Sequence, residues 1–148
     1  MAPVKAGVAF ICLASAASAA VPAAAGEVVI TVTELRSNKG VVRACMTTKE
    51  KIFPKCRKDP ASYRAVVPAG KKITIRFAGV EPGDYAIALL HDENNDGKAN
   101  RALGMMPKEG YGFSRDAKVR MGPPKFEDAV FTHEDNDQDL SITMRYFL

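Results

Sequence analysis

Apolar and polar residues alternate through much of this chain, and this alternation limits the folds that it can adopt. In EVVITVTEL, Val28, Ile30 and Val32 occupy one face of an extended segment, and the residues between them occupy the other. Such a pattern is typical of a strand with one buried face. No segment after residue 25 sustains the period of an amphipathic helix. The sequence therefore predicts an all-β protein.

About seven segments have the length and pattern of strands, and residues that favour turns separate them. We expect strands at Glu27–Leu35, Val41–Met46, Tyr63–Val67, Lys71–Phe77, Tyr85–Leu90, Phe126–Phe131 and Leu140–Phe147. The fifth is almost continuously apolar, which indicates a central strand covered on both faces. Strands of this number and spacing predict a single antiparallel β-sandwich.

The first 25 residues have the layout of a secretory signal peptide. Lys5 is followed by the apolar run Ala6–Ala20 and then by small residues. The run is shorter than the roughly 20 residues of a membrane-spanning helix. We therefore expect residues 1–25 to be removed and residues 26–148 to form the β-sandwich domain, in the periplasm or secreted. The mature protein is not expected to span a membrane.

Two cysteines, Cys45 and Cys56, remain after the expected cleavage. An even pair in an oxidising compartment predicts a disulfide. Such a bond would contribute about 3 kcal/mol in the loop-entropy model. A redox pair would have the spacing C-x-x-C, and a zinc site would need two further ligands. We therefore expect a structural disulfide.

The net charge of +4 is mild, and the basic residues are scattered along the chain. Their densest group is Lys49, Lys51, Lys55, Arg57 and Lys58. A nucleic-acid-binding surface would need a basic stripe with interleaved aromatic residues. No nucleic-acid partner is expected.

An acidic stretch, HDENNDGKAN, follows the fifth predicted strand. Its acids and amides alternate before a glycine, as in the first nine positions of an EF-hand calcium loop. The twelfth position is Leu103 instead of glutamate, and a strand leads into the loop. This excludes an EF-hand and leaves two interpretations, a strand-borne calcium site or a structured turn held by Asn and Asp side chains. The candidate calcium ligands are Asp92, Asn94, Asp96, Lys98 through its carbonyl, Asn100 and Glu109.

Two further segments are a candidate ligand-contact segment and a second acidic run. In EGYGFS, Tyr111, Phe113 and Ser114 could contact a ligand beside the acidic loop, or the aromatic rings could cover one end of the core while the glycines permit tight bends. A second acidic run, His133–Asp139, has no glycine and is predicted to be a solvated hairpin connection between strands.

Three ordered blocks resemble a bacterial exported family known as domain of unknown function 2141. They are HDENNDGKAN, LGMMPKEGYGFSRDA and GPPKFEDAVF. The resemblance implies an exported β-sandwich of the transthyretin or immunoglobulin-like sort, with no established activity. It departs at Ala99, where members of that family often carry an aspartate.

No catalytic residues are predicted. Ser114 lacks a G-x-S-x-G context, and nothing in the sequence places His91 and His133 together. We expect a non-catalytic module that binds an envelope protein or a small ligand, with calcium as its one expected cofactor. The alternatives are a hydrolase of envelope carbohydrate or peptide that uses the acidic loop and EGYGFS, and a structural protein whose strand edge pairs with a partner.

Overall fold

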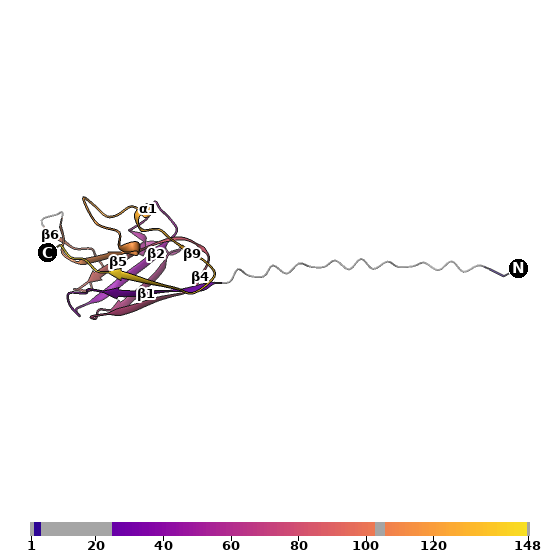
Figure 1. Ribbon diagram of the computed structural model, residues 1–148, viewed down its shortest axis with the longest axis horizontal. Coiled ribbons are helices and arrows are strands. Elements are labelled where there is room, and N and C mark those ends of the chain that lie inside the picture. Colours follow the sequence, from indigo (N-terminus) through magenta and orange to yellow (C-terminus); the bar gives the residue numbers. More distant parts are fainter. Residues whose placement is uncertain (1, 4–24, 103–105, 148) are drawn as a thin grey trace.

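The computed structural model describes residues 2–3, 25–102 and 106–147. The predicted signal peptide lies almost entirely outside these residues, and it stays a prediction. Two sheets form the body of the domain (Figure 1). The all-β prediction is confirmed. No helix in the described part of the chain is long and apolar enough to cross a membrane.

The first sheet has three strands in the order β10-β1-β4. Their bounds are Gln138–Thr143 for β10, Gly26–Thr33 for β1 and Ile73–Val80 for β4. The β1–β4 pair is antiparallel, but β10 runs parallel to β1, with Ile30 opposite Leu140. This pair departs from the expected antiparallel pattern, because β10 follows a strand of the other sheet and reaches β1 by a crossover.

The second sheet has the order β3-β2-β5-β8, and β9 also pairs with β5. The bounds are β3 Tyr63–Pro68, β2 Val41–Thr47, β5 Gly83–Asp92, β8 Gly110–Phe113 and β9 Phe131–His133. A small third sheet pairs β6, Arg101–Ala102, with β7, Met106–Pro107. All strand pairs within these two sheets are antiparallel.

The main core lies between the two larger sheets. The alternating residues Val28, Ile30 and Val32 of β1 are fully buried there, as the sequence predicts. The second sheet contributes the inward residues of β2 and β5, including Ile87 and Leu89. Each such side chain contributes about 1.5–3 kcal/mol through burial.

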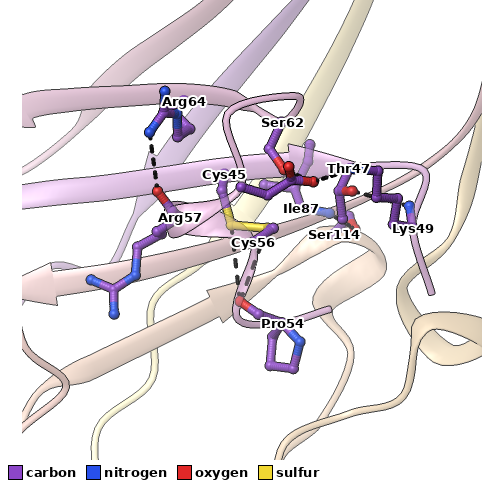
Figure 2. The surroundings of a disulfide bond; sticks show 11 residues. Cys45, Thr47, Lys49, Pro54, Cys56, Arg57, Ser62, Arg64, Ile87 and Ser114 are labelled. Atoms are coloured by element: carbon purple, nitrogen blue, oxygen red, sulfur yellow. Dashed lines mark hydrogen bonds and ion pairs between the residues drawn. A yellow bond between two sulfur atoms is a disulfide. The ribbon is translucent and has the colours of Figure 1, made fainter. Parts of the chain in front are cut away.

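A second apolar cluster covers part of the outer face of the five-stranded sheet. Cys45 on β2 and Cys56 on η1, Cys56–Lys58, form the predicted disulfide there, with Cα atoms 5.7 Å apart (Figure 2). Ala86 and Ala88 join this cluster from β5. From Tyr85 onward, β5 is therefore buried on both faces, which confirms the expectation of a central strand.

The observed strands differ from the predicted ones at their ends, and the last two predicted strands differ most. Phe126–Phe131 is not one strand: Phe126–Ala129 forms the short helix α1, and β9 follows it. The Lys125 N–H donates to Asp128 Oδ2 at 3.0 Å, and this local cap favours the helical turn. The last strand begins at Gln138 and ends at Thr143, whose N–H donates to Asp116 Oδ1.

The expected hairpin at residues 133–139 is also wrong. β9 belongs with β5, whereas β10 belongs with β1, so this segment connects two different sheets. The acidic stretch at residues 133–139 is therefore a crossover between layers.

Asp116 lies in the 3-10 turn η2, Ser114–Asp116, which links β8 to the strand end at Thr143.

Candidate functional site

Asp92 ends the buried strand β5 and organises the acidic loop that follows. Its side chain is fully buried. Asp92 Oδ1 accepts a hydrogen bond from the N–H of Asp96 at 3.1 Å, and Oδ2 accepts one from the N–H of Gly97 at 2.9 Å. The turn needs left-handed backbone at Asn95 and Gly97, with φ of 54° and 76°. The loop is thus folded around a single carboxylate.

Three carboxylates converge inside this loop. One oxygen atom from each of Asp92, Asp96 and Glu109 lies within 4.8 Å of the others. Glu109, which precedes β8, is only 4% exposed. The N–H of Asn100 donates to Glu109 Oε2 at 3.2 Å, so the end of the acidic stretch is tied to the segment before β8. The arrangement places oxygen ligands from distant positions around one small space.

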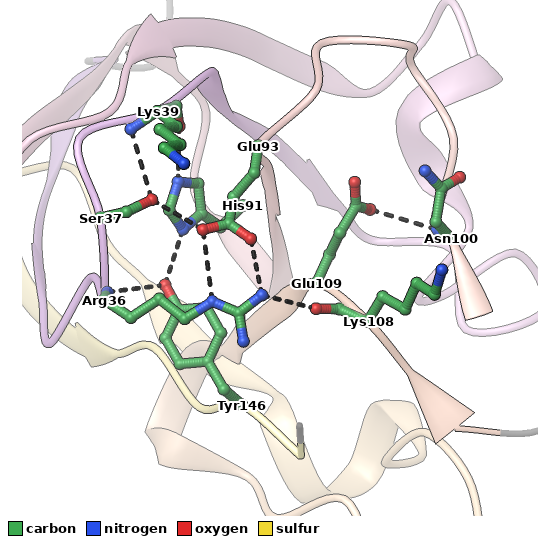
Figure 3. Close-up of polar contacts among 9 residues, drawn as sticks. All are labelled: Arg36, Ser37, Lys39, His91, Glu93, Asn100, Lys108, Glu109 and Tyr146. Carbon is green, nitrogen blue, oxygen red and sulfur yellow. Dashed lines mark hydrogen bonds and ion pairs between the residues drawn. The ribbon is translucent and has the colours of Figure 1, made fainter. Parts of the chain in front are cut away.

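Arg36 braces the loop from outside. Its guanidinium Nη2 donates to Glu93 Oε2 at 2.6 Å and to the Lys108 carbonyl at 2.8 Å (Figure 3). Glu93 follows Asp92, and Lys108 precedes Glu109. One side chain therefore positions both segments that carry the buried carboxylates. This ion pair lowers the pKa of Glu93 to about 2, helped by the hydroxyl of Ser37.

A buried histidine anchors the end of β5 to two other segments. His91 is fully buried, with Nε2 2.8 Å from the Lys39 carbonyl and Nδ1 2.7 Å from the Tyr146 hydroxyl. The carbonyl accepts only, so Nε2 donates to it. The Tyr146 ring also covers Gly110, where an added Cβ would approach within 2.4 Å of ring carbon. Glycine at this position allows that close contact.

The electrostatics of the cluster favour a cation. Burial raises the pKa of Glu109, and the charges of Asp92, Asp96 and Glu93 raise it further, against the opposing effect of the Asn100 N–H. By contrast, hydrogen bonds from the Asn100 side chain and the Lys98 N–H lower the pKa of Asp96. A divalent cation among the carboxylates would offset the repulsion that Glu109 experiences.

Arg43 supplies one positive charge to this site. It lies on β2, and its Nε donates to Asp92 Oδ2 at 2.7 Å. Its Nη2 donates to Asn95 Oδ1 at 2.8 Å. A metal ion at Asp92 would share that carboxylate with the guanidinium. The guanidinium therefore already offsets part of the negative charge of the cluster.

The six predicted calcium ligands occupy different places. The structure brings together the carboxylates of Asp92, Asp96 and Glu109. The amide nitrogens of Asn94 and Asn100 donate to Asp96 Oδ2, at 3.1 and 3.0 Å. Lys98 donates its backbone N–H to Asp96 Oδ1. The amides therefore support Asp96 in this arrangement, and three carboxylates form the candidate ligand set.

The three predicted contact residues of EGYGFS also separate. Ser114 is buried, accepts a hydrogen bond from the Ile87 N–H and donates to the Ala129 carbonyl. Its hydroxyl therefore joins β5 to α1, and the prediction that Ser114 touches a ligand stays a prediction. Tyr111 and Phe113 stack with ring centroids 6.4 Å apart on the outer face of the sheet, where both line a groove.

Sequence reasoning missed the two arginines that hold the acidic loop. Arg43 and Asp92 are 49 positions apart, and Arg36 and Glu93 are 57 apart. The one available signal is that Arg43 alternates with the inward-facing residues of its strand, so that its own side chain lies on the outer face of the sheet. No local pattern points to Arg36.

Comparisons with known proteins give one match. The model of a family described as an uncharacterized protein conserved in bacteria (DUF2141) matches residues 30–141. No curated protein and no solved structure matches the chain. The matched range includes the five-stranded sheet, β4, parts of β1 and β10, and the whole acidic loop.

Proposed function

This chain belongs to the bacterial DUF2141 family, and from this premise we propose that it is an exported, non-catalytic binding module whose acidic loop holds a calcium ion. The observation that carries the proposal is the convergence of three carboxylates, two of them buried. Ionised carboxylates in such a position are unfavourable without a compensating charge. Arg43 compensates Asp92, and calcium would compensate the cluster as a whole.

Calcium suits this loop better than magnesium. Calcium accepts six to eight oxygen ligands in flexible geometry, whereas magnesium demands a near-ideal octahedron and keeps its water. The three carboxylates come from a turn and from the segment before β8, an irregular arrangement that fits the more tolerant ion. The ion would stiffen the loop between Asp92 and Glu109.

Two sequence features support export. The N-terminal 25 residues have the pattern of a signal peptide. Cys45 and Cys56 are paired as a disulfide, which is a bond typical of oxidising compartments. We propose the periplasm as the location, with secretion beyond it as the alternative.

A thermal melt of the oxidised protein tests the calcium site. At a calcium concentration of about 100 times the dissociation constant, binding adds about 2.7 kcal/mol. This corresponds to a rise in Tm of about 10 °C for a domain near this size. Magnesium at the same concentration should give a smaller rise. A melt that does not change with calcium would refute the site.

Paired variants separate a ligand role from a structural role. Asp96→Asn with Glu109→Gln should abolish the calcium-dependent rise. Gln at position 109 removes a repelled charge, whereas Asn at position 96 weakens hydrogen bonds that the ionised Asp96 accepts, so the rise is measured against the melt of the same variant in EDTA. Glu134→Gln with Asp135→Asn makes the same charge change in the second acidic run and should keep the rise. If both double variants respond to calcium equally, the ion does not bind at Asp92–Glu109.

A further inference from the structure

A broad groove lies on the outer face of the five-stranded sheet, beside the second apolar cluster, which contains the Cys45–Cys56 disulfide. Its volume is about 1470 Å³. Strand register places two rows of side chains across its floor. The first row is Val66, Arg43, Leu90 and Tyr111, and the second is Arg64, Cys45, Ala88 and Phe113. All of these except Cys45 line the groove.

Cations surround this floor. Lys55, Arg57 and Lys58 lie along the segment that carries η1. Arg64, on β3, donates to the Arg57 carbonyl at 3.4 Å (Figure 2). Arg101 and Arg120 line the groove from β6 and from the loop after η2.

The charges of the groove are strongly unbalanced. None of the described residues that line it is acidic. Within the described part of the chain, Arg43 is also the one groove cation that forms an ion pair. Like charges gathered without counter-charges create a positive potential that attracts an anion.

The groove also gathers exposed apolar side chains. Among the described residues, the four large apolar side chains with high exposure are Val66, Met106, Met121 and Phe147. All four line this groove, and Met121 is fully exposed. Clustered exposed apolar residues mark binding surfaces, and methionine adapts its shape to flexible apolar partners. A small inorganic anion would leave these side chains without contacts.

We propose that this groove binds a single-chain lipid that ends in a phosphate or carboxylate. The cations would hold the anionic head group, and the exposed side chains of Val66, Met106 and Met121 would cover the acyl chain. A groove of this volume has room for one such molecule. An acidic peptide would satisfy the cations but would place polar backbone against these apolar side chains.

This inference rests on the proposed binding role but not on calcium. The groove borders the acidic loop at Gly97 and Ala99, and Arg43 reaches both the groove and Asp92. The floor and most of the cations belong to β2, β3, β5, β8 and η1, outside the loop that follows Asp92. Lipid binding is therefore expected in calcium and in EDTA alike, so failure of one proposal can be told from failure of the other.

Titration calorimetry of the oxidised protein with dodecyl phosphate, below its micelle concentration, tests the proposal. Dodecyltrimethylammonium has the same chain with the opposite charge, and inorganic phosphate has the head group alone. We expect saturable binding of dodecyl phosphate at one site and at least about tenfold weaker binding of both controls, because charge and apolar contact act together.

Matched variants locate the site. Arg57→Glu with Arg101→Glu should weaken dodecyl phosphate binding about tenfold or more. Lys71→Glu with Lys72→Glu makes the same charge change at exposed positions outside the groove and should leave the affinity unchanged. Met121→Ser with Val66→Thr should weaken binding about threefold or more without changing the melt, since both side chains are exposed.

Three results would overturn the proposal. The first is equal affinity for dodecyl phosphate and inorganic phosphate, which would indicate a simple anion site. The second is binding to phosphatidylglycerol vesicles with none to monomeric dodecyl phosphate, which would indicate a membrane surface. The third is an equal loss of affinity in the two charge-reversal variants, which would indicate attraction by net charge alone.

Discussion

Residues 91–100 and residues 133–139 are both acidic, and each begins with a buried histidine at the end of a strand. In the first, the chain turns tightly at Gly97, and the segment before β8 returns Glu109 to the carboxylates of Asp92 and Asp96. In the second, the chain crosses from one sheet to the other, and its acids are exposed. The comparison shows that acidic composition alone does not bring carboxylates together, whereas a turn with a returning strand does.

The hydrogen bonds of the two stretches differ in the same way. Asp92 is fully buried and accepts bonds from two backbone N–H groups and from Arg43. In the second stretch, Asp137 accepts one bond, from the Glu27 N–H at 2.8 Å. His133 Nε2 lies 3.2 Å from the Val80 carbonyl, so this histidine fixes the crossover to the sheet.

Replacing Asp92 should produce the largest effect. Asp92→Ala leaves Arg43 and two N–H groups without their acceptor, which should cost about 3 kcal/mol of unfolding free energy. Asp137→Ala removes one exposed bond and should cost about 1 kcal/mol or less. Urea denaturation of both variants measures the difference. Equal losses would mean that the two stretches are structurally equivalent.

Gly97 tests the tight turn of the first stretch. Its φ of 76° is unfavourable for alanine, and Gly97→Ala should cost about 1–2 kcal/mol. Gly122→Ala is the control, because an added Cβ meets no atom within 4 Å there. Its effect should stay within about 0.5 kcal/mol. Urea denaturation measures the free energy of unfolding of each variant. If Gly97→Ala does not lower it, the turn at Gly97 does not require a glycine.

The ion pair of Glu93 predicts a smaller, pH-dependent effect. Its pKa is lowered from 4.5 to about 2, so the folded state binds this proton less readily than the unfolded state. The stabilisation is therefore fully present above pH 4.5 and is lost as the pH falls toward 2. Partial exposure of the pair reduces its contribution to about 1 kcal/mol.

Glu93→Gln should flatten the stability curve between pH 4.5 and pH 2, measured by denaturation at each pH. The control is Glu134→Gln in the second stretch, where the side chain is exposed and the curve should not change. If the stability curve of Glu93→Gln coincides with that of the unmodified protein, the Arg36–Glu93 ion pair does not stabilise the site.

The strands that carry the core could be predicted because burial follows local alternation. Val28, Ile30 and Val32 alternate with the less buried Val29, Thr31 and Thr33, and packing between two sheets uses that period directly. The segment at Phe126 could not be predicted in this way, because a cap formed by Lys125 and Asp128 outweighs its apolar composition. The parallel pairing of β10 depends on the crossover between sheets, and no local sequence pattern indicates such a crossover.

The candidate metal site could be predicted in part. Alternating oxygen ligands before Gly97 identified Asp92 and Asp96, and Glu109 followed as the nearby carboxylate. Arg43 and Arg36 could not be found, because their partners lie far away in the sequence. The groove was missed for the same reason, since its cations come from several strands and turns and gather only in the folded sheet.

The most direct test of the calcium site is a calcium titration followed by amide NMR of the oxidised protein. Saturable shifts should be largest for the amides of Asp96, Gly97, Lys98 and Asn100, whose N–H groups bond to the clustered carboxylates. Residues 134–139 should show little change. Shifts confined to residues 134–139, or no saturable shift at several millimolar calcium, would contradict the site.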